Sequence, residues 1–201
     1  MIEVYADIWC PFAYVGLHAA LERERSAPLL IHPWPLELVN GQGLSPETTL
    51  RHVHELREQV APDLFADFRV DRFPSTTLPA LALVMAGYRV DAARGEALSV
   101  ALREALFEEG RDIADDTTLG EIARAHDVQV TPADDAEVLT QYRAGQVRGV
   151  KGSPHFFCGD TDAFCPTLDI TRDATDHLLL RANAARLDAF LDACALDAAD
   201  H

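Results

Sequence analysis

The stretch "DIWCPFAYVG", residues 7–16, places a cysteine and a proline where an apolar strand ends and a helix begins. Before it, residues 2–9 alternate in hydropathy, which is typical of a strand with one apolar face. After it, residues 11–25 predict a helix with proline in the first turn, where a missing amide hydrogen costs nothing. Residues 29–38 predict a second strand, irregular near its two prolines. A strand, a helix and a strand in close succession favour a βαβ unit with parallel strands.

The next hundred or so residues predict a block of helices. Proline at position 79 and the apolar spacing of residues 93–113 indicate two of them. Three further helices have start signals, which are Ser45-Pro46-Glu47, a capping box of Thr118 with Glu121, and Thr131-Pro132. Short loops join these helices, so we expect a packed insert and not a linker.

The last fifty residues return to strands. Two aromatic stretches, His155–Cys158 and Asp162–Cys165, flank a Gly159-Asp160 turn signal and predict a hairpin. Residues 177–181 predict a further short strand, and Asn183 is expected to cap a final amphipathic helix. The predicted order is therefore β-α-β, a helical block, then β-β-α.

That order is an α/β arrangement, the thioredoxin fold with helices inserted between its halves. We expect a thioredoxin-like domain made of residues 1–42 and 146–201, and a helical insert domain of residues 43–145. "YADIWCPFAYVG" (5–16) resembles the first active-site motif of DsbA-family oxidoreductases, usually Cys-Pro-x-Cys followed by tyrosine and a small residue. "GVKGSPHFF" (149–157) is similar to the family's Gly-x-x-Gly-x-Pro loop, whose proline is cis and faces the active-site sulfur.

The sequence of the helical insert indicates which branch of the family the chain resembles. "ALREALFEEGRDIADDTTLGEIA" (101–123) looks like the insert helices of the FrnE-type branch, which also includes 2-hydroxychromene-2-carboxylate isomerases. The chain departs from the dithiol pattern at Ala13, where the family carries the second cysteine that releases the product. The isomerase branch carries a serine at the position of Cys10, and there the serine helps to activate a bound glutathione thiol. This chain lies between the two patterns.

Cys10 is the predicted catalytic residue. If a helix starts at Pro11, free amides and the positive end of the helix dipole point toward the Cys10 sulfur. We therefore expect the pKa of this thiol to fall below the value of about 8.5 for free cysteine. A charged Asp7 nearby would oppose that shift. The alternative is a buried, unreactive cysteine, but strand carboxyl ends in open α/β sheets are where ligands bind.

The predicted thiol-binding residues flank Cys10 in sequence or lie on the proline loop. The resemblance implies that the Ser153–Pro154 bend pairs with an extended thiol peptide such as glutathione. His155 is either a base that orients a thiol or a structural histidine. Trp9 and Phe12 either form a stacking wall or pack in the core. The full predicted set is Trp9, Pro11, Phe12, Ala13, Ser153, Pro154 and His155.

Three further cysteines are present. A two-residue turn at Gly159-Asp160 would put Cys165 opposite Pro154, close to the Cys10 sulfur, where it could resolve a mixed disulfide; a longer loop would place it elsewhere. Cys158 and Cys165 could instead bond across the hairpin, and Cys194 is expected in the core. No cysteine or histidine spacing matches a zinc site, so no metal is predicted.

The net charge of −16 argues against nucleic acid and against anionic membranes as partners, because both require clustered cations. The first residues resemble no signal peptide and no apolar run is long enough to span a bilayer, so we expect a cytoplasmic protein. Many relatives with this fold are dimers, which makes a homodimer the default expectation.

Three functions remain open at this point. The first is a thiol-disulfide oxidoreductase or thiol transferase acting through a single reactive cysteine, with a small thiol such as glutathione or mycothiol as co-substrate. The second is a glutathione-dependent isomerase or transferase of the 2-hydroxychromene-2-carboxylate isomerase type, with the small thiol as bound cofactor. The third is a non-catalytic, DsbA-like protein that binds a thiol or another ligand.

Overall fold

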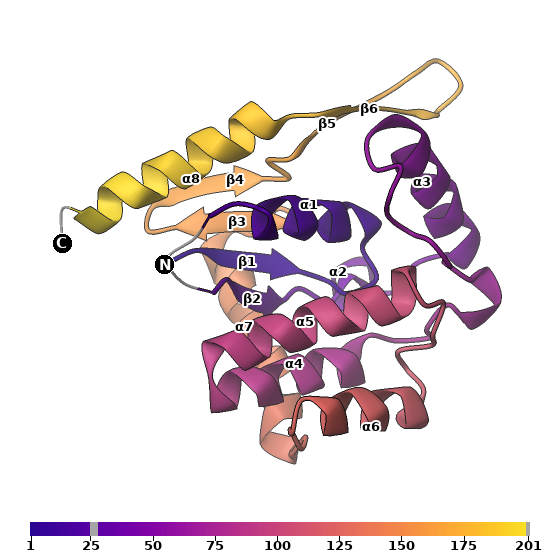
Figure 1. The fold of residues 1–201 in the computed structure, drawn as a ribbon, viewed down its shortest axis with the longest axis vertical. Coiled ribbons are helices and arrows are strands. Elements are labelled where there is room, and N and C mark those ends of the chain that lie inside the picture. Colours follow the sequence, from indigo (N-terminus) through magenta and orange to yellow (C-terminus); the bar gives the residue numbers. More distant parts are fainter. Residues whose placement is uncertain (25–27, 200–201) are drawn as a thin grey trace.

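A four-stranded mixed sheet forms the centre of the molecule in the computed structural model, which describes residues 1–24 and 28–199 (Figure 1). The strand order is β2-β1-β3-β4, and the strands are β1 (Glu3–Ala6), β2 (Leu30–Pro33), β3 (His155–Cys158) and β4 (Thr161–Phe164). β1 pairs in parallel with β2 and antiparallel with β3. The predicted βαβ unit is therefore confirmed, with α1 (Pro11–Leu21) as its crossover helix.

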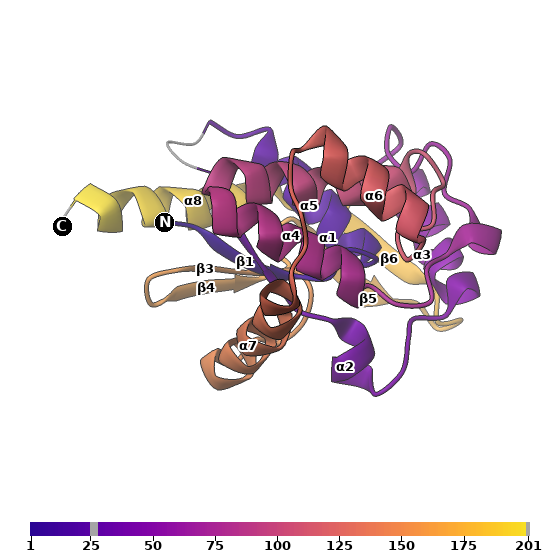
Figure 2. The same ribbon diagram turned by 90° about the horizontal axis from the view of Figure 1, so that it is seen from below.

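Helices cover both faces of this sheet. α1 and α8 (Ala184–Ala199) lie on one face, and α7 (Pro132–Arg148) lies on the other (Figure 2). Successive strand residues point to opposite faces. Val4 and Phe156 accordingly pack in the core beneath α1 and α8, whereas Tyr5 and Phe157 pack with Trp34 and Tyr142 on the α7 side.

The helical block is present between the two halves of the sheet. Its helices are α2 (Leu36–Asn40), α3 (Pro46–Gln59), a 3-10 turn (Val70–Arg72), α4 (Leu78–Val90), α5 (Ala92–Phe107), α6 (Asp116–Ala125) and α7. The predicted starts at Ser45 and Thr131 are confirmed, since Ser45 Oγ accepts the Thr48 amide and Thr131 forms a capping box with Asp134. The predicted start at Thr118 is wrong. Asp115 caps α6, because its carboxylate accepts the Thr118 amide at 2.8 Å.

Two other predicted boundaries are wrong. The strand predicted over residues 29–38 ends at Pro33, and residues 36–40 form α2, whose first amide, that of Leu36, donates to the buried Asp7 carboxylate. The helix predicted over residues 11–25 ends at Leu21, and Arg25 lies outside the described residues. The first difference depends on the contact of Leu36 with the distant Asp7, which local patterns do not encode.

A second, two-stranded sheet precedes α8. β6 (Leu178–Ala182) matches the predicted short strand and pairs antiparallel with β5 (Leu168–Arg172), which the sequence did not indicate. Four of the five β5 residues are exposed, so this strand lacks the apolar alternation that marks a half-buried one. Asn183 caps α8 as expected, because its side chain accepts the Arg186 amide at 3.0 Å. No helix in the described ranges has the length and apolar character needed to cross a bilayer.

The outer edge of β2 is closed by two side chains. The Tyr88 hydroxyl accepts the Ile31 amide at 2.7 Å and donates to the Leu29 carbonyl at 2.8 Å. The Glu96 carboxylate accepts the Leu29 amide at 2.6 Å. These groups of α4 and α5 therefore occupy the backbone positions that a neighbouring strand would otherwise use.

Candidate active site around Cys10

Cys10 lies where β1 leads into α1. Its backbone is extended and serves as the N-cap residue of α1, and Pro11 occupies the first turn. The amides of Ala13 and Phe12 point at the sulfur and favour its ionised form. The thiol itself donates to the backbone oxygen of Ser153, with 3.3 Å between sulfur and oxygen. The structure thus brings Cys10 and the predicted bend together across 143 positions of sequence.

The Ser153–Pro154 bend is held from two sides, and its peptide bond is cis. The Asp7 amide donates to Ser153 Oγ at 2.9 Å, which ties the bend to the end of β1. A Cβ atom at Gly16 would lie only 3.1 Å from Pro154 Cγ, so glycine allows α1 to approach the proline ring closely. The position of the bend over Cys10 therefore depends on the end of β1 and on the middle of α1.

Burial, not the helix, dominates the ionisation of Cys10. Only 4% of the residue is exposed. Loss of solvation raises the pKa of the Cys10 thiol above its ordinary value, and the nearby Asp7 charge raises it further. Ser153 and the α1 amides lower the pKa, but by less. The predicted lowering is therefore wrong, because position at a helix start does not offset removal from water.

Beneath Cys10 lies a buried acid. Asp7 is fully buried, and its carboxylate accepts the backbone amides of Ile8 and Leu36. Burial raises its pKa to about 6, although these hydrogen bonds and the Arg103 charge oppose the rise. Asp7 is therefore ionised at neutral pH but becomes neutral in mildly acidic solution.

Arg103 is the group that sequence reasoning missed. It lies on α5, is 1% exposed, and donates to the Asp7 backbone oxygen at 3.1 Å and to the Ser99 carbonyl at 2.8 Å. Burial lowers its pKa to about 10, so the guanidinium stays charged at neutral pH. No local pattern marks it, because position 103 lies outside the apolar stripe of Leu98, Leu102, Ala105 and Leu106. Arginines are almost never fully buried unless they are paired.

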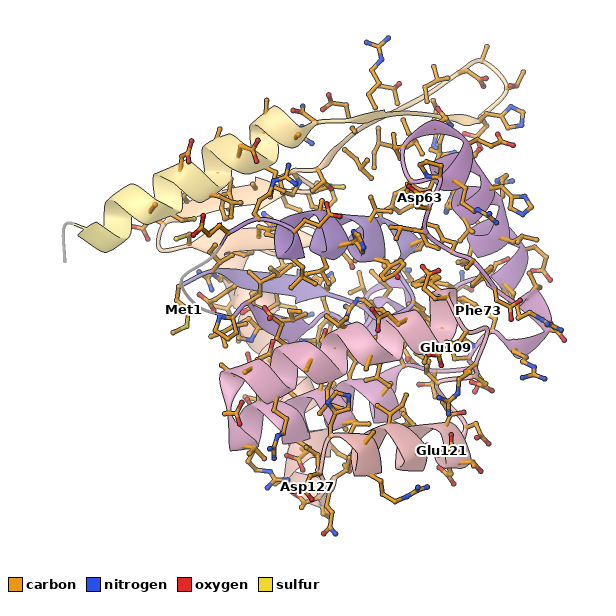
Figure 3. The ribbon with its side chains drawn as sticks, in the orientation of Figure 1. Met1, Asp63, Phe73, Glu109, Glu121 and Asp127 are labelled. Atoms are coloured by element: carbon orange, nitrogen blue, oxygen red, sulfur yellow. The ribbon has the colours of Figure 1, made fainter. Side chains whose placement is uncertain are left out.

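The aromatic neighbours of Cys10 differ in accessibility. Trp9 is fully buried and stacks on Phe73, with ring centroids 5.6 Å apart; Phe73 comes from the segment between α3 and α4 and is labelled in Figure 3. Phe12 is half-buried and contacts the ring of His52, with centroids 5.2 Å apart. Of these two rings, Phe12 is therefore the one that an incoming molecule can reach.

Ala13 and His155 both face inward. Ala13 is fully buried in the core beneath α1 and α8. His155 is also fully buried: its Nδ1 accepts the Lys151 amide at 3.1 Å, so its Nε2 carries the hydrogen and donates to the Asp162 carboxylate at 3.0 Å. Burial lowers the pKa of His155. With both ring nitrogens engaged, the histidine fixes the hairpin to the segment that leads into the bend.

The hairpin carries Cys165 to the same bend. Cys158 pairs with Thr161, which leaves Gly159 and Asp160 as the predicted two-residue turn. With that register, the Cys165 amide donates to the Pro154 carbonyl at 3.0 Å, so the expectation that Cys165 lies opposite Pro154 is confirmed. All four cysteines are buried, and Cys194 packs in the core as expected.

A separate cavity of about 450 Å³ contains none of the predicted site residues. It lies among β2, α4 and α7, and its lining includes Leu30, Met85, Tyr88, Arg89, Ala133 and Glu137. Within the described ranges, no cluster of three or more histidine, cysteine or acidic side chains could hold a metal ion.

Known structures share this fold. The cytosolic disulfide reductase DsbM from Pseudomonas aeruginosa is 19% identical, with 96% of this chain and 97% of that chain covered and a TM-score of 0.58. A structure of DsbM with GSH gives 18% identity and the same coverage and TM-score. A protein from Nitrosomonas europaea that is described as a proposed protein disulfide isomerase is 17% identical over 98% of this chain and 97% of that chain, with a TM-score of 0.65.

The likeness extends to the isomerase branch. A 2-hydroxychromene-2-carboxylate isomerase is 15% identical, with 100% of this chain and 98% of that chain covered and a TM-score of 0.63. At these identities the structures show a common fold. Among curated protein sequences, none matches this chain. The DSBA-like thioredoxin domain family matches residues 1–175, from β1 through the helical block to the hairpin that carries Cys165. The chain therefore belongs to the family of DSBA-like thioredoxin domain proteins.

Proposed function

We propose that this protein is a thiol-disulfide oxidoreductase or thiol transferase that reacts through Cys10, with a small thiol such as glutathione or mycothiol as co-substrate. The observation that carries the proposal is the placement of the Cys10 sulfur at the start of α1, 3.3 Å from the Ser153 carbonyl oxygen at the bend. The structure of DsbM with GSH supports a small thiol as the partner of this fold.

In the proposed reaction, the Cys10 thiolate attacks one sulfur of a disulfide. The sulfur–sulfur bond of the substrate breaks, one half leaves as a thiolate that takes up the proton lost by Cys10, and the other half stays on Cys10 as a mixed disulfide. A further thiol then attacks that mixed disulfide and restores Cys10. Phe12 and the Ser153–Pro154 bend are the proposed contacts for the disulfide, with Trp9, Pro11 and Ala13 shaping the site from behind.

The raised pKa of Cys10 favours reduction of disulfides over their formation. Strong oxidants of this fold stabilise their reduced form as a thiolate. Burial denies Cys10 that stabilisation, because the thiol stays protonated at neutral pH. The disulfide form of Cys10 is therefore a weaker electron acceptor than in those oxidants. We accordingly propose that the protein reduces disulfides.

The test is turnover of bis(2-hydroxyethyl) disulfide with glutathione as reductant. We expect Cys10→Ser to abolish turnover and Cys194→Ala, which removes a core thiol far along the chain, to preserve it. Full turnover by the Cys10→Ser protein would contradict the proposal, and equal unfolding midpoints of the two variants in urea show that both are folded.

One observation favours a second function. Cys10 stays neutral and donates its S–H to a carbonyl, at the position where the isomerase branch carries a serine hydroxyl. A neutral donor there would hold a bound glutathione thiolate, and the protein would act as a glutathione-dependent isomerase or transferase. In that case Cys10→Ser retains isomerase activity on a 2-hydroxychromene-2-carboxylate, whereas the oxidoreductase proposal requires its disulfide turnover to be lost.

Two further properties are part of the proposal. Cys10, Cys158 and Cys165 are buried thiols that form no disulfide, which fits a reducing compartment and supports the predicted cytoplasmic location. The predicted homodimer is tested by sedimentation equilibrium across a range of protein concentrations. A mass that stays at 22.1 kDa throughout would contradict it.

A further inference from the structure

We propose that Cys165 is a second catalytic residue: it attacks the mixed disulfide on Cys10, and the resulting Cys10–Cys165 disulfide is what the small thiol reduces. This inference rests on the proposed function and replaces only its resolving step. It would supply, from the other half of the fold, the thiol that is missing at Ala13.

The bend brings the two cysteines to one place. The Cys10 thiol contacts the carbonyl of Ser153, and the Cys165 amide contacts the carbonyl of Pro154, the next residue. Both cysteines are at most 5% exposed, and Cys10 is near enough for its charge to act on the Cys165 thiol. The Cys10 sulfur and the Cys165 backbone are thus each hydrogen-bonded to one of two consecutive residues of the bend.

Cys165 is held in a backbone conformation that is rare for its residue type. Its φ angle is +44°, in the left-handed region that non-glycine residues seldom adopt. Arg186 of α8 holds this turn by donating to the Cys165 carbonyl at 2.6 Å and to the Pro166 carbonyl at 3.1 Å. Such conformations persist where surrounding contacts enforce them. The fold therefore fixes the direction from which Cys165 emerges.

The charge state of Cys10 affects the pKa of the Cys165 thiol. Burial raises the pKa of Cys165 to about 12, and the next cause is negative charge on Cys10; Asp169 also raises the pKa and Arg186 lowers it. A Cys10 that has formed a mixed disulfide carries no charge. In the mixed disulfide the charge of Cys10 can therefore no longer raise the pKa of Cys165, whereas Arg186 still lowers it against the larger effect of burial.

The step balances without any added oxidant, because the disulfide substrate is the electron acceptor. Cys10 attacks the disulfide and one thiol leaves. Cys165 then attacks the Cys10 sulfur. The bond between the Cys10 sulfur and the substrate sulfur breaks, and the second thiol leaves with the proton of Cys165. The protein loses two hydrogens and two electrons, and the substrate gains them. Two molecules of small thiol then reduce the protein disulfide and leave as their own disulfide.

The other thiols serve as controls. Cys158 is on the same hairpin but pairs with Thr161 at the opposite end of β4 from Cys165. Cys194 is buried on α8. Because Cys158 lies on the same hairpin but at the end away from the bend, Cys158→Ala is the matched variant for Cys165→Ser.

The experiment is a single-turnover reaction of the reduced full-length protein with one equivalent of oxidised glutathione. The reaction is stopped with acid, free thiols are alkylated, released glutathione is counted, and the peptides are mapped by mass spectrometry. We expect the wild type and Cys158→Ala to release two glutathiones per protein and to contain a Cys10–Cys165 disulfide. We expect Cys165→Ser to release one and to retain glutathione on Cys10.

The outcomes separate the two proposals. If the wild type releases one glutathione and keeps the other on Cys10, the role of Cys165 is overturned and the proposed function stands. If it releases none and Cys10 remains alkylatable, both are overturned. A double variant, Ala13→Cys with Cys165→Ser, restores release of the second glutathione only when the defect of Cys165→Ser is the loss of a resolving thiol and not misfolding.

Discussion

Asp7 and Cys10 are two acids buried three residues apart, and each ionises at the expense of the other. Asp7 is fully buried and Cys10 is 4% exposed, so solvent screens their interaction poorly. Negative charge on Asp7 raises the pKa of Cys10. The ionisation of the Cys10 thiol therefore depends on the charge of Asp7 as well as on burial.

The first prediction concerns the thiol alone. The alkylation rate of Cys10 with iodoacetamide should rise with pH and reach its half-maximum above the value of about 8.5 for free cysteine, because burial opposes ionisation. Peptide mapping after alkylation at a series of pH values gives the midpoint. A midpoint below 8 would show that the α1 amides outweigh burial.

Replacing Asp7 with asparagine should lower that midpoint. Asp7→Asn removes the charge but keeps one oxygen to accept the Ile8 or Leu36 amide. The matched control is Asp63→Asn, which removes an exposed acid on the loop after α3 (Figure 3). We expect the alkylation midpoint to fall in Asp7→Asn and to stay unchanged in the control. Equal midpoints in all three proteins would contradict the coupling.

Asp7 should also contribute more to the stability of the folded state in acid than at neutral pH. Its pKa in the folded state, about 6, lies above its value in an unfolded chain, so proton binding favours the folded state. This stabilisation is complete below about pH 4 and is lost as the pH rises through 6. One pKa unit is worth about 1.4 kcal/mol, which gives roughly 3 kcal/mol for this residue. Urea unfolding of wild type and Asp7→Asn at pH 4.5 and 7.5 isolates the contribution.

At the scale of elements, α1 approaches the bend closely because it carries Gly16. An alanine there would gain helix propensity of about 1 kcal/mol, but its Cβ would lie 3.1 Å from Pro154 Cγ and displace the bend. Gly120 of α6 has open space around it. We expect Gly120→Ala to raise the free energy of unfolding by up to about 1 kcal/mol without affecting Cys10. Gly16→Ala should gain less and should change the alkylation rate of Cys10.

Local signals predicted most elements. Ser45, Thr131 and Asn183 are caps whose partners lie within one turn, so the residues themselves determine where α3, α7 and α8 begin. The elements that were missed depend on distant partners. α2 begins where the Asp7 carboxylate receives the Leu36 amide, and the exposed β5 is a strand because it pairs with β6.

The candidate site also has features that local motifs predict and features that depend on distant segments. Cys10, the bend and the two-residue turn that aligns Cys165 follow from short motifs, and they meet in the structure as expected. The ionisation of Cys10 could not be predicted, because it depends on how completely the folded chain removes the thiol from water. The buried Arg103 belongs to the helical block, and its contact with Asp7 spans 96 positions of sequence.

At the scale of the whole molecule, Arg103 joins the helical block to the end of β1. Arg103→Met keeps much of the side-chain volume but removes the donor to the Asp7 carbonyl and the positive charge that acts on the Asp7 carboxylate. We expect the free energy of unfolding to fall by roughly 2–4 kcal/mol. Arg124→Met, an exposed change on α6, should have little effect in the same denaturant titration. A comparable loss in both variants would contradict the special role of Arg103.

Tyr88 and Glu96 restrict the ways in which copies of this chain can associate through the edge of β2. They already satisfy both Leu29 backbone groups and the Ile31 amide along the outside of β2, so an incoming strand cannot pair with those groups to extend the hydrogen-bond ladder. Self-association is thereby directed to side-chain surfaces or to another margin of the fold. The sheet is protected on that flank from the edge-to-edge polymerisation to which open sheets are prone.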